Sequence, residues 1–190
     1  EPLGSAESAV QFRFNTVRIY PSIVFPMAPL TTRDGPIVMS RVSLVKGILK
    51  TLAIAQAMPE EQFRIVGYSE FDCPTPPNMT ITGKGDPHEY LSNASVYLSP
   101  FLTETYGMAM VEAQHRGVPV VASHKCAVKD DSLIQYGYSI PNYDSVEDWV
   151  SAIKLAKELP DSTVEQRNFF EERHDPIANA QDLVDAISSL

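Results

Sequence analysis

The sequence predicts an α/β fold in which a doubly wound parallel sheet of about six strands is covered by helices on both faces. Two observations carry this prediction. Six short apolar runs follow residue 36, and helical patterns separate most of them. Strands that alternate with helices are typical of parallel sheets, because each crossover helix packs back onto the sheet. The length of 190 residues and the hydrophobic content of 44% suit one domain with a full core.

The expected strands are short, apolar and bounded by turn residues, as buried strands of parallel sheets are. They cover Ile37–Ser40, Phe63–Gly67, Met79–Thr82, Val96–Ser99, Val118–Ala122 and Tyr138–Ile140. Upstream of them, Val10, Phe12 and Phe14 alternate with polar residues, which predicts extended chain.

Helical patterns fill most of the intervals between these strands and the end of the chain. Gly47 to Met58 carries a broad apolar stripe. A short helix is expected over Asp86–Asn93 with Asp86 as its N-cap, and Asp144 or Ser145 has the same role in a longer one. The expected helices after Asp86–Asn93 cover Met108–Arg116, a short turn at Asp130–Tyr136, then Asp144–Leu159, Val164–Arg173 and Pro176–Ser189.

Composition divides the chain into three parts. Residues 1–8 include Pro2-Leu-Gly-Ser5 and no initiating Met, and we expect them to be the remnant of an expression tag. Residues 9–36 are expected to form a connector, because prolines punctuate them at Pro21, Pro26, Pro29 and Pro36. Residues 37–190 are expected to form the domain itself.

Charge and composition argue against several classes of protein. The net charge of −9 disfavours nucleic-acid binding, which needs basic surfaces. No stretch approaches the roughly 20 apolar residues of a membrane span, and no signal-peptide pattern is present. The two cysteines, Cys73 and Cys126, and the four scattered histidines lack metal-ligand spacing, so no metal is expected. Reduced cysteines without a secretory signal predict a cytoplasmic location.

The most informative stretch runs from Glu104 to Ser123, where Glu104 and Glu112 lie around a helix start and Gly117 ends the helix. Two such glutamates alone are common on exposed helices, but here they follow a parallel strand, where open α/β sheets bind ligands. The free N–H groups of a helix start suit phosphate. Glu104 can reach a group beyond the phosphates, and Glu112 can accept hydrogen bonds from a ribose diol. Phosphates between a sugar and a ribose describe a nucleotide sugar.

Two cations precede this stretch. Arg41 and Lys46 lie between the first strand and the first helix, where a guanidinium and an ammonium can bind a diphosphate that also contacts the helix start at Gly107. By position alone, solvated surface cations are an equally good interpretation. The Gly83-Lys-Gly85 triplet lets backbone approach a base, although a simple turn is the more frequent role.

At this point a family resemblance becomes clear. Residues 37–123 resemble the carboxyl-terminal, donor-binding domain of GT-B fold glycosyltransferases, closest to the large retaining family with the Glu-x7-Glu signature that includes glycogen and sucrose synthases. The matching segments are Ser40-Arg41 with Lys46-Gly47, Ile65-Val-Gly67, Val96-Tyr-Leu-Ser-Pro100, Glu104-Thr-Tyr-Gly107, and Glu112-Ala with Gly117-Val-Pro-Val-Val-Ala122. The resemblance implies a Rossmann-like domain that is one half of a GT-B fold.

The resemblance also implies roles for individual residues. The implied donor-binding residues are Arg41, Lys46, Glu104, Thr105, Tyr106, Gly107, Met108 and Glu112. The two cations hold the donor diphosphate, and the amides from Thr105 to Met108 cradle phosphate. Glu104 contacts the sugar hydroxyls and is the candidate catalytic residue, while Glu112 binds the ribose. Cations and the helix end neutralise the leaving diphosphate, so a nucleotide-diphosphate sugar is expected as substrate and no metal as cofactor.

Two departures from the family pattern affect the expected partners. The loop His124-Lys-Cys-Ala-Val-Lys129 replaces the usual Gly-Gly loop with its acidic end, which puts its base or sugar contacts in question. The amino-terminal domain that supplies the acceptor site in the family is not part of these 190 residues. We therefore expect a missing amino-terminal or neighbouring domain to close the cleft over a glycan, lipid or protein acceptor. The apolar segment around Ile23, Val24 and Phe25 is its expected contact.

Two classes of function remain open on sequence grounds. The first is a glycosyltransferase domain that transfers a hexosyl or deoxyhexosyl group to an acceptor hydroxyl with retention of the anomeric configuration. The second is a non-catalytic nucleotide-sugar-binding or structural module that reuses the fold. A third, weaker interpretation is another enzyme of nucleotide-diphosphate sugars, such as an epimerase. The charged set of Arg41, Lys46, Glu104 and Glu112 favours the first.

Overall fold

The computed structural model describes residues 20–25, 30–69, 74–124 and 134–189. Its six strands confirm the predicted ones, with ends that differ by no more than two residues. They are β1 (Ile37–Val42), β2 (Phe63–Ser69), β3 (Met79–Thr82), β4 (Val96–Ser99), β5 (Val120–Ser123) and β6 (Gly137–Ile140). The expected extended segment over residues 10–19 and most of the helical turn at Asp130–Tyr136 lie outside the described residues, as do Cys73 and Cys126.

The strands form one parallel sheet in the order β3-β2-β1-β4-β5-β6. This is the order of a Rossmann-type doubly wound sheet, in which the winding direction reverses between β1 and β4. The central strands β4 and β5 are buried along their whole length, because helices cover both faces of the sheet. The reversal places the segments that follow β1 and β4 on opposite sides of one crevice at the carboxyl edge.

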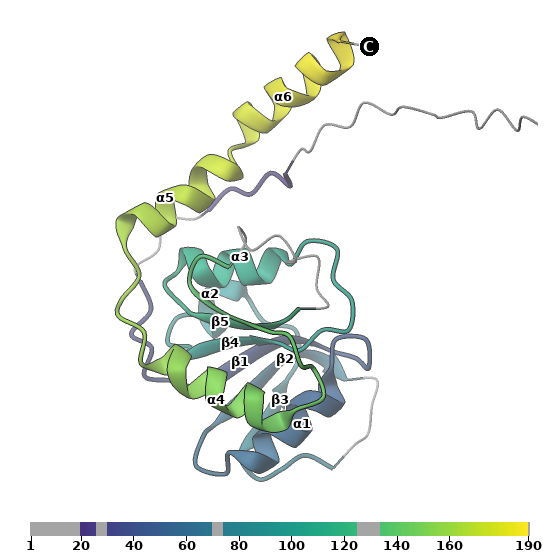
Figure 1. The fold of residues 1–190 in the computed structure, drawn as a ribbon, viewed down its shortest axis with the longest axis vertical. Helices are drawn as coiled ribbons and strands as arrows, with labels where there is room; N and C mark the ends of the chain where they lie inside the picture. The colour runs from purple at the N-terminus through teal and green to yellow at the C-terminus, as the bar shows by residue number, and fades with distance from the viewer. Residues whose placement is uncertain (1–19, 26–29, 70–73, 125–133, 190) are drawn as a thin grey trace, which may run out of the picture.

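Helices cover both faces of this sheet, whereas the last two helices of the chain extend away from it (Figure 1). The described helices are α1 (Ile48–Ala57), α2 (Pro87–Tyr90), α3 (Met108–His115), α4 (Val146–Lys157), α5 (Val164–Arg173) and α6 (Pro176–Ser188). α1 and α4 pack together on one face, α2 and α3 lie on the other, and α5 packs against α3. The predicted helix over Asp86–Asn93 is therefore shorter than expected, a single turn, whereas the other described helices confirm their predictions.

Gly117 ends α3 as the sequence predicted. Its φ is 79°, a left-handed conformation that favours glycine. The N–H of Val118 donates to the carbonyl of Ala113 (2.9 Å) and the N–H of Gly117 to that of Gln114 (2.9 Å). This is the Schellman pattern. It turns the chain directly into Pro119 and the buried β5, and so fixes the orientation of α3 relative to the sheet.

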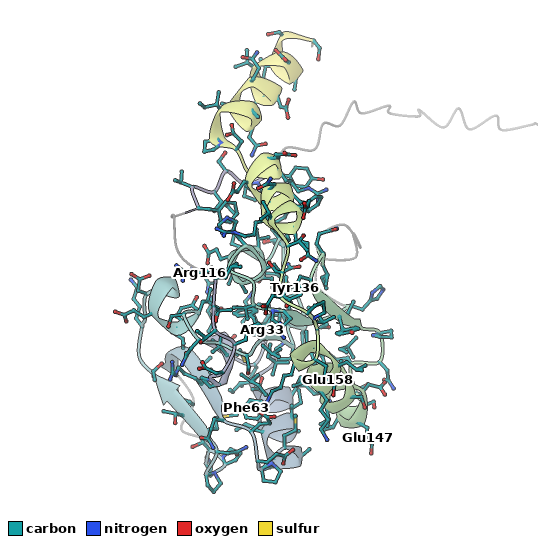
Figure 2. The ribbon with its side chains drawn as sticks, turned by 90° about the vertical axis from the view of Figure 1, so that its left-hand side faces the viewer. Arg33, Phe63, Arg116, Tyr136, Glu147 and Glu158 are labelled. Carbon is teal, nitrogen blue, oxygen red and sulfur yellow. The ribbon has the colours of Figure 1, made fainter. Side chains whose placement is uncertain are left out.

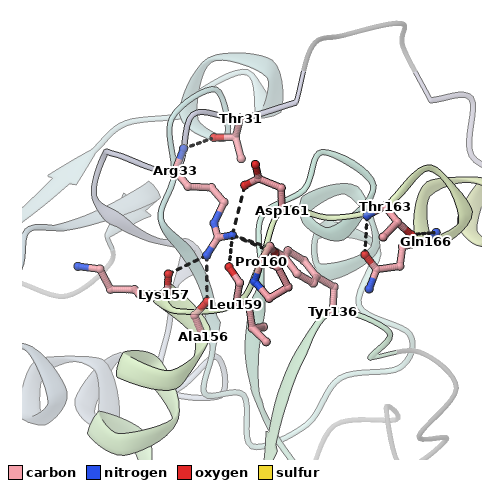
Figure 3. A network of polar contacts seen from close by, with 10 residues as sticks. All are labelled: Thr31, Arg33, Tyr136, Ala156, Lys157, Leu159, Pro160, Asp161, Thr163 and Gln166. Carbon is pink, nitrogen blue, oxygen red and sulfur yellow. Dashed lines mark hydrogen bonds and ion pairs between the residues drawn. The ribbon is translucent and has the colours of Figure 1, made fainter.

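Arg33 fastens the segment before β1 to the end of α4 (Figure 3). Its guanidinium donates to the carbonyls of Ala156 (3.1 Å), Lys157 (3.0 Å) and Leu159 (2.8 Å), and to the hydroxyl of Tyr136 (2.6 Å). The first two carbonyls belong to the last helical turn, where the usual donors four residues further on are missing, although the carbonyl of Ala156 also accepts the N–H of Leu159 (3.3 Å). Figure 2 shows Arg33 and Tyr136 side by side. The second half of the expected connector is thus packed against the domain.

The segment 20–25 crosses α3 and α5 rather than exposing its apolar residues to a partner. Ile23 is buried in a small cluster with Val111 and Phe170, and Phe25 packs against the same cluster. The Phe25 ring stacks on that of His115, with centroids 4.0 Å apart. Only Val24 of the three apolar residues is fully exposed, at 81%. Ile23 is therefore not exposed as expected, because the domain's own helices bury it, whereas Val24 stays accessible. That this segment marks where a partner joins stays a prediction.

Candidate functional site

A cavity of about 600 Å³ opens at the carboxyl edge of the sheet, where the winding direction reverses. Segments that follow β1, β2, β3 and β4 line it, together with α3. The lining residues are Ser40, Arg41, Lys46, Val66, Gly67, Lys84, Gly85, Tyr90, Phe101, Glu104, Thr105, Gly107, Met108, Ala109, Met110 and Glu112. All of the predicted donor-binding residues except Tyr106 line this one cavity, although they were chosen from the sequence.

Two helices begin at this edge of the sheet, and each is preceded by a glycine with a left-handed backbone conformation. Gly47 precedes α1 and Gly107 precedes α3, and both have left-handed conformations, with φ of 78° and 90°. A side chain on Gly47 would lie 1.9 Å from the carbonyl oxygen of Pro100, so only glycine fits there. No side chain caps the N-terminus of α3. The N–H of Met110 donates to the carbonyl of Gly107 (2.8 Å), so Met108 and Ala109 carry the first-turn N–H groups that suit an anion.

Arg41 occupies an irregularity in β1. The register of β1 with β2 shifts between Ser40 and Val42, and Arg41 has φ of 67°. A left-handed conformation costs a non-glycine residue about 1–2 kcal/mol. The bulge lies against Gly67, where an added Cβ would meet the Cα of Arg41 at 3.2 Å. Strained residues of this kind cluster at functional sites. Here the strained residue is Arg41, whose guanidinium is predicted to bind phosphate.

Lys46 and Glu104 form an ion pair inside the cavity, with Nζ 2.7 Å from Oε2. The ammonium also lies over the ring of Phe101, 4.4 Å from its centroid. The other carboxylate oxygen of Glu104 accepts hydrogen bonds from the N–H groups of Thr105 (2.9 Å) and Tyr106 (3.4 Å). Partial burial works to raise the pKa of Glu104, but the hydrogen bond and charge of Lys46 outweigh it and hold this pKa below its usual value.

Glu112 lies further along α3, on the wall of the cavity that it shares with Tyr90. Burial, followed by the negative charges of Glu112 and Asp86, raises the pKa of Tyr90 to about 12, so its phenol stays protonated. On the floor, the hydroxyl of Ser40 is hydrogen-bonded to that of Tyr97, whose full burial raises its pKa. Glu112 therefore lies near the hydroxyl groups of Tyr90 and Tyr97 and near the charge of Arg116, whereas Glu104 is paired with Lys46.

Tyr106 is the predicted site residue that the structure places elsewhere. Its side chain turns away from the cavity and contacts His174, with the phenol oxygen 3.1 Å from Nε2. Its predicted role used only the backbone amide, which donates to Glu104. The cavity wall also includes Lys84, Tyr90 and Phe101, to whose side chains no role was assigned from the sequence. The glycines on both sides of Lys84 could have marked it as a site residue in the sequence. Nothing in the sequence distinguished Tyr90 or Phe101 from aromatic residues of the core.

A larger hollow, of about 810 Å³, runs beside this cavity along β2 and β3. The two share Val66, Lys84, Gly85 and Tyr90. Carboxylates and cations alternate along it, and it contains none of the predicted site residues. We therefore place the candidate site in the smaller cavity, where the helix ends and the charged groups converge.

Two other properties concern the described part of the chain as a whole. Among these residues, no group of three or more His, Cys, Asp or Glu side chains is arranged to hold a metal ion. None of the helices described here has the length and apolar character needed to cross a bilayer. Residues 125–129 of the loop that departs from the family pattern lie outside the described residues.

Solved structures that share this fold include glycosyltransferases. Sucrose-phosphate synthase from Thermosynechococcus elongatus is 21% identical with a TM-score of 0.65, over 83% of this chain and 46% of that one. The apo form of the lipopolysaccharide outer core galactosyltransferase WaaB is 17% identical with a TM-score of 0.71, over 91% and 55%. Anabaena HepE in complex with UDP-glucose is 17% identical with a TM-score of 0.64, over 83% and 50%. At such identities the likeness concerns the fold.

The chain spans about half the length of these solved structures. No curated protein sequence matches it. The family model for group 1 glycosyl transferases matches residues 37–156, which include all six strands and every residue that lines the cavity. The chain therefore belongs to the group 1 glycosyltransferases.

Proposed function

We propose that this chain is the donor-binding half of a retaining glycosyltransferase, which binds a nucleotide-diphosphate sugar and presents it to an acceptor hydroxyl. The observation that carries the proposal is the convergence of Arg41, Lys46, Glu104 and Glu112 on one cavity at the helix start of α3. A structural module has no physical reason to gather these charges around a helix N-terminus, because the partial burial of Lys46, Glu104 and Glu112 costs free energy without a ligand.

The diphosphate would lie between the first turn of α3 and the cations opposite it. Met108 and Ala109 contribute first-turn N–H groups, and Arg41 and Lys46 contribute charge-assisted hydrogen bonds. Lys84 adds a third cation on the far wall. These groups offset the overall charge of −9 locally, since a pocket lined by cations and a helix end sets its own potential.

The sugar and the ribose would occupy opposite ends of the cavity. Glu104 lies beside Lys46 before the helix start, which suits contact with sugar hydroxyls next to the phosphate. Glu112 lies about one turn into α3 and shares the cavity wall with Tyr90, which suits a ribose diol. From Tyr90 the wall continues to Lys84 and Gly85, so this side would receive the base. HepE, which shares the fold, contains UDP-glucose in its structure, and uridine diphosphate is therefore the first probe to test.

In transfer, the bond between the anomeric carbon and the phosphate oxygen breaks while the acceptor oxygen binds the anomeric carbon, and the proton of the acceptor hydroxyl passes to the leaving phosphate oxygen. Negative charge grows on the leaving diphosphate. Arg41, Lys46 and the α3 N-terminus would stabilise that charge more strongly in the transition state than in the ground state, which is the requirement for catalysis. We propose that these groups do so without a metal ion. The acceptor, a glycan, a lipid or a protein, would bind to a further domain, because this chain supplies one wall only.

Isothermal calorimetry with uridine, adenosine and guanosine diphosphates and their sugars tests the proposal. We expect weak binding of at least one diphosphate. Arg41→Ala and Lys46→Ala should each weaken it by about 1–3 kcal/mol, the range for hydrogen bonds to charged groups. Lys154→Ala, which removes an exposed cation on α4, is the matched control. Absence of binding for every diphosphate and sugar at millimolar ligand would refute the donor site.

Turnover separates the transferase from a non-catalytic module. Alignment of acceptor, anomeric carbon and leaving phosphate accounts for several kcal/mol of a typical barrier, so the 190-residue chain alone should show little transfer. Activity should appear when the acceptor-binding domain is supplied, and Glu104→Gln should then reduce it. Donor binding with no turnover in the completed protein would instead support the binding module.

A further inference from the structure

Three segments that are distant in sequence meet at His174, the residue that ends α5. They are the segment 20–25, the loop from Glu104 to Gly107 and the α5–α6 junction. His174 is fully buried. Its Nδ1 lies 3.0 Å from the carbonyl oxygen of Pro21 and its own carbonyl accepts the N–H of Ile23 at 3.0 Å. The ring of Tyr106 meets that of His174 edge-on, with centroids 5.5 Å apart.

The partners of His174 determine its tautomer. A carbonyl oxygen only accepts, so Nδ1 must carry the proton that is donated to Pro21. In the neutral ring Nε2 then has only a lone pair, and the hydroxyl of Tyr106 must donate to it over 3.1 Å. Burial lowers the pKa of His174 and so favours this neutral form. Both ring nitrogens are thereby satisfied, and each holds a different segment.

Tyr106 links His174 to the candidate donor site. It lies two residues after Glu104 and directly before Gly107, and its N–H donates to the carboxylate of Glu104. Its ring packs against the cluster of Ile23, Val111 and Phe170. A shift of the Tyr106 ring would therefore move both the carboxylate and the helix start that precedes Met108. Gly107 in its left-handed conformation has no side chain of its own to hold the loop.

We propose that Tyr106 and His174 form a positioning pair for donor binding. The hydrogen bond from Tyr106 to His174 holds the Glu104–Gly107 loop in the conformation in which the N–H groups of Thr105 and Tyr106 fix the Glu104 carboxylate beside Lys46, at the start of α3. Neither side chain lines the cavity, so the pair acts through the backbone. This inference rests on the proposed function, because it assigns the pair a role in the binding of the donor diphosphate.

Tyr106→Phe tests the pair with the smallest change, since it removes only the hydroxyl. Uridine diphosphate is the probe, titrated by calorimetry, and urea denaturation reports stability. We expect Tyr106→Phe to weaken binding by about three- to tenfold, the equivalent of one net hydrogen bond. His174→Leu should weaken it to a similar extent, and the double variant should bind no more weakly than the weaker single variant, because all three remove the same Tyr106–His174 hydrogen bond.

Two comparisons separate positioning from general stability. Tyr136→Phe removes a hydroxyl that is hydrogen-bonded to Arg33 and Pro160, away from the cavity. It should lower stability and leave affinity unchanged. His174→Gln keeps an acceptor for Tyr106 and a donor for Pro21, so it should retain more affinity than His174→Leu. The positioning role would be overturned if Tyr106→Phe left the affinity for uridine diphosphate unchanged, or if Tyr136→Phe lowered this affinity to the same extent.

Hydrogen exchange distinguishes failure of the pair from failure of the proposed function. If the wild-type chain does not bind uridine diphosphate, the proposed donor site is wrong for that ligand. The conformation of the Glu104–Gly107 loop can still be tested by amide exchange. Tyr106→Phe should speed amide exchange from Thr105 to Met108 in the ligand-free protein, while exchange in β4 stays unchanged. Equal exchange of the loop in the two proteins would overturn the positioning role.

Discussion

The ammonium of Lys46 lies 2.7 Å from a carboxylate oxygen of Glu104, so the proposed phosphate ligand and the proposed sugar ligand are paired with each other in the ligand-free site. Each side chain is about one-sixth exposed, at 15% and 16%. A bound diphosphate must share or displace this contact. The ion pair thus compensates both charges when no donor is bound, and a donor that binds must compete with this contact.

The two carboxylates should have separable effects on binding. Glu104→Gln removes the competitor for Lys46, so we expect uridine diphosphate to bind equally well or tighter by up to about 1 kcal/mol, the upper value for exposed pairs. The sugar-bearing donor should lose affinity. Glu112→Gln should weaken both ligands, because the ribose belongs to both. Calorimetry with the two ligands checks this, and equal effects of the two substitutions on the diphosphate alone would contradict the assignment.

The strain at Arg41 predicts opposite changes in stability and affinity. Arg41→Gly removes the guanidinium but suits the φ of 67°, so it should be more stable than Arg41→Ala by about 1 kcal/mol. Both variants should weaken diphosphate binding to the same extent. Urea denaturation and calorimetry measure the two properties. If the Arg41→Gly protein is no more stable to urea than the Arg41→Ala protein, the backbone at this bulge is not strained.

The buried histidines should make the domain less stable in mild acid. Burial lowers the pKa of both His174 and His115 below 6.5, although Glu171 opposes the shift at His115 and Arg173 adds to it at His174. The unfolded chain then binds protons more readily than the folded one, so stability is full above pH 6.5 and falls as the pH decreases below it. Urea midpoints at pH 8, 6 and 5 test the direction. A His174→Gln variant should show a shallower decline.

The cap that Arg33 forms on α4 should be a stability determinant without influence on the site. Arg33→Lys cannot reproduce the fork to Ala156, Lys157 and Tyr136, and we expect a loss of about 2–3 kcal/mol. Affinity for uridine diphosphate should stay unchanged, because Arg33 does not line the cavity. A stability close to that of the wild type would show that the lysine replaces the fork through a single contact.

Removal of metal ions should leave donor binding intact. The proposal assigns neutralisation of the diphosphate to Arg41, Lys46, Lys84 and the α3 N-terminus. Calorimetry with uridine diphosphate in excess EDTA, compared with millimolar magnesium, checks this. A tenfold or greater loss of affinity in EDTA would mean that a cation takes part in the binding of the diphosphate.

The sequence by itself determined the six strands and the helices that follow them, because a buried parallel strand needs a short apolar run and its crossover needs helical periodicity. Gly117 illustrates this local control, since its conformation and the start of β5 depend on neighbours within a few residues. The charged cavity set was also predictable. The carboxyl ends of β1 and β4 meet at one edge in any sheet of this topology, so Arg41 and Glu104 had to approach each other.

Only the tertiary structure decided which contacts cross between distant segments. The Tyr106 side chain contacts His174, the apolar residues Ile23 and Phe25 lie against α3 and α5, and Arg33 caps α4. No local pattern marks these choices, because each depends on where a segment more than 60 residues away has been placed. Local propensity specifies elements, whereas the partners of a buried polar group are set by the packing of the whole chain.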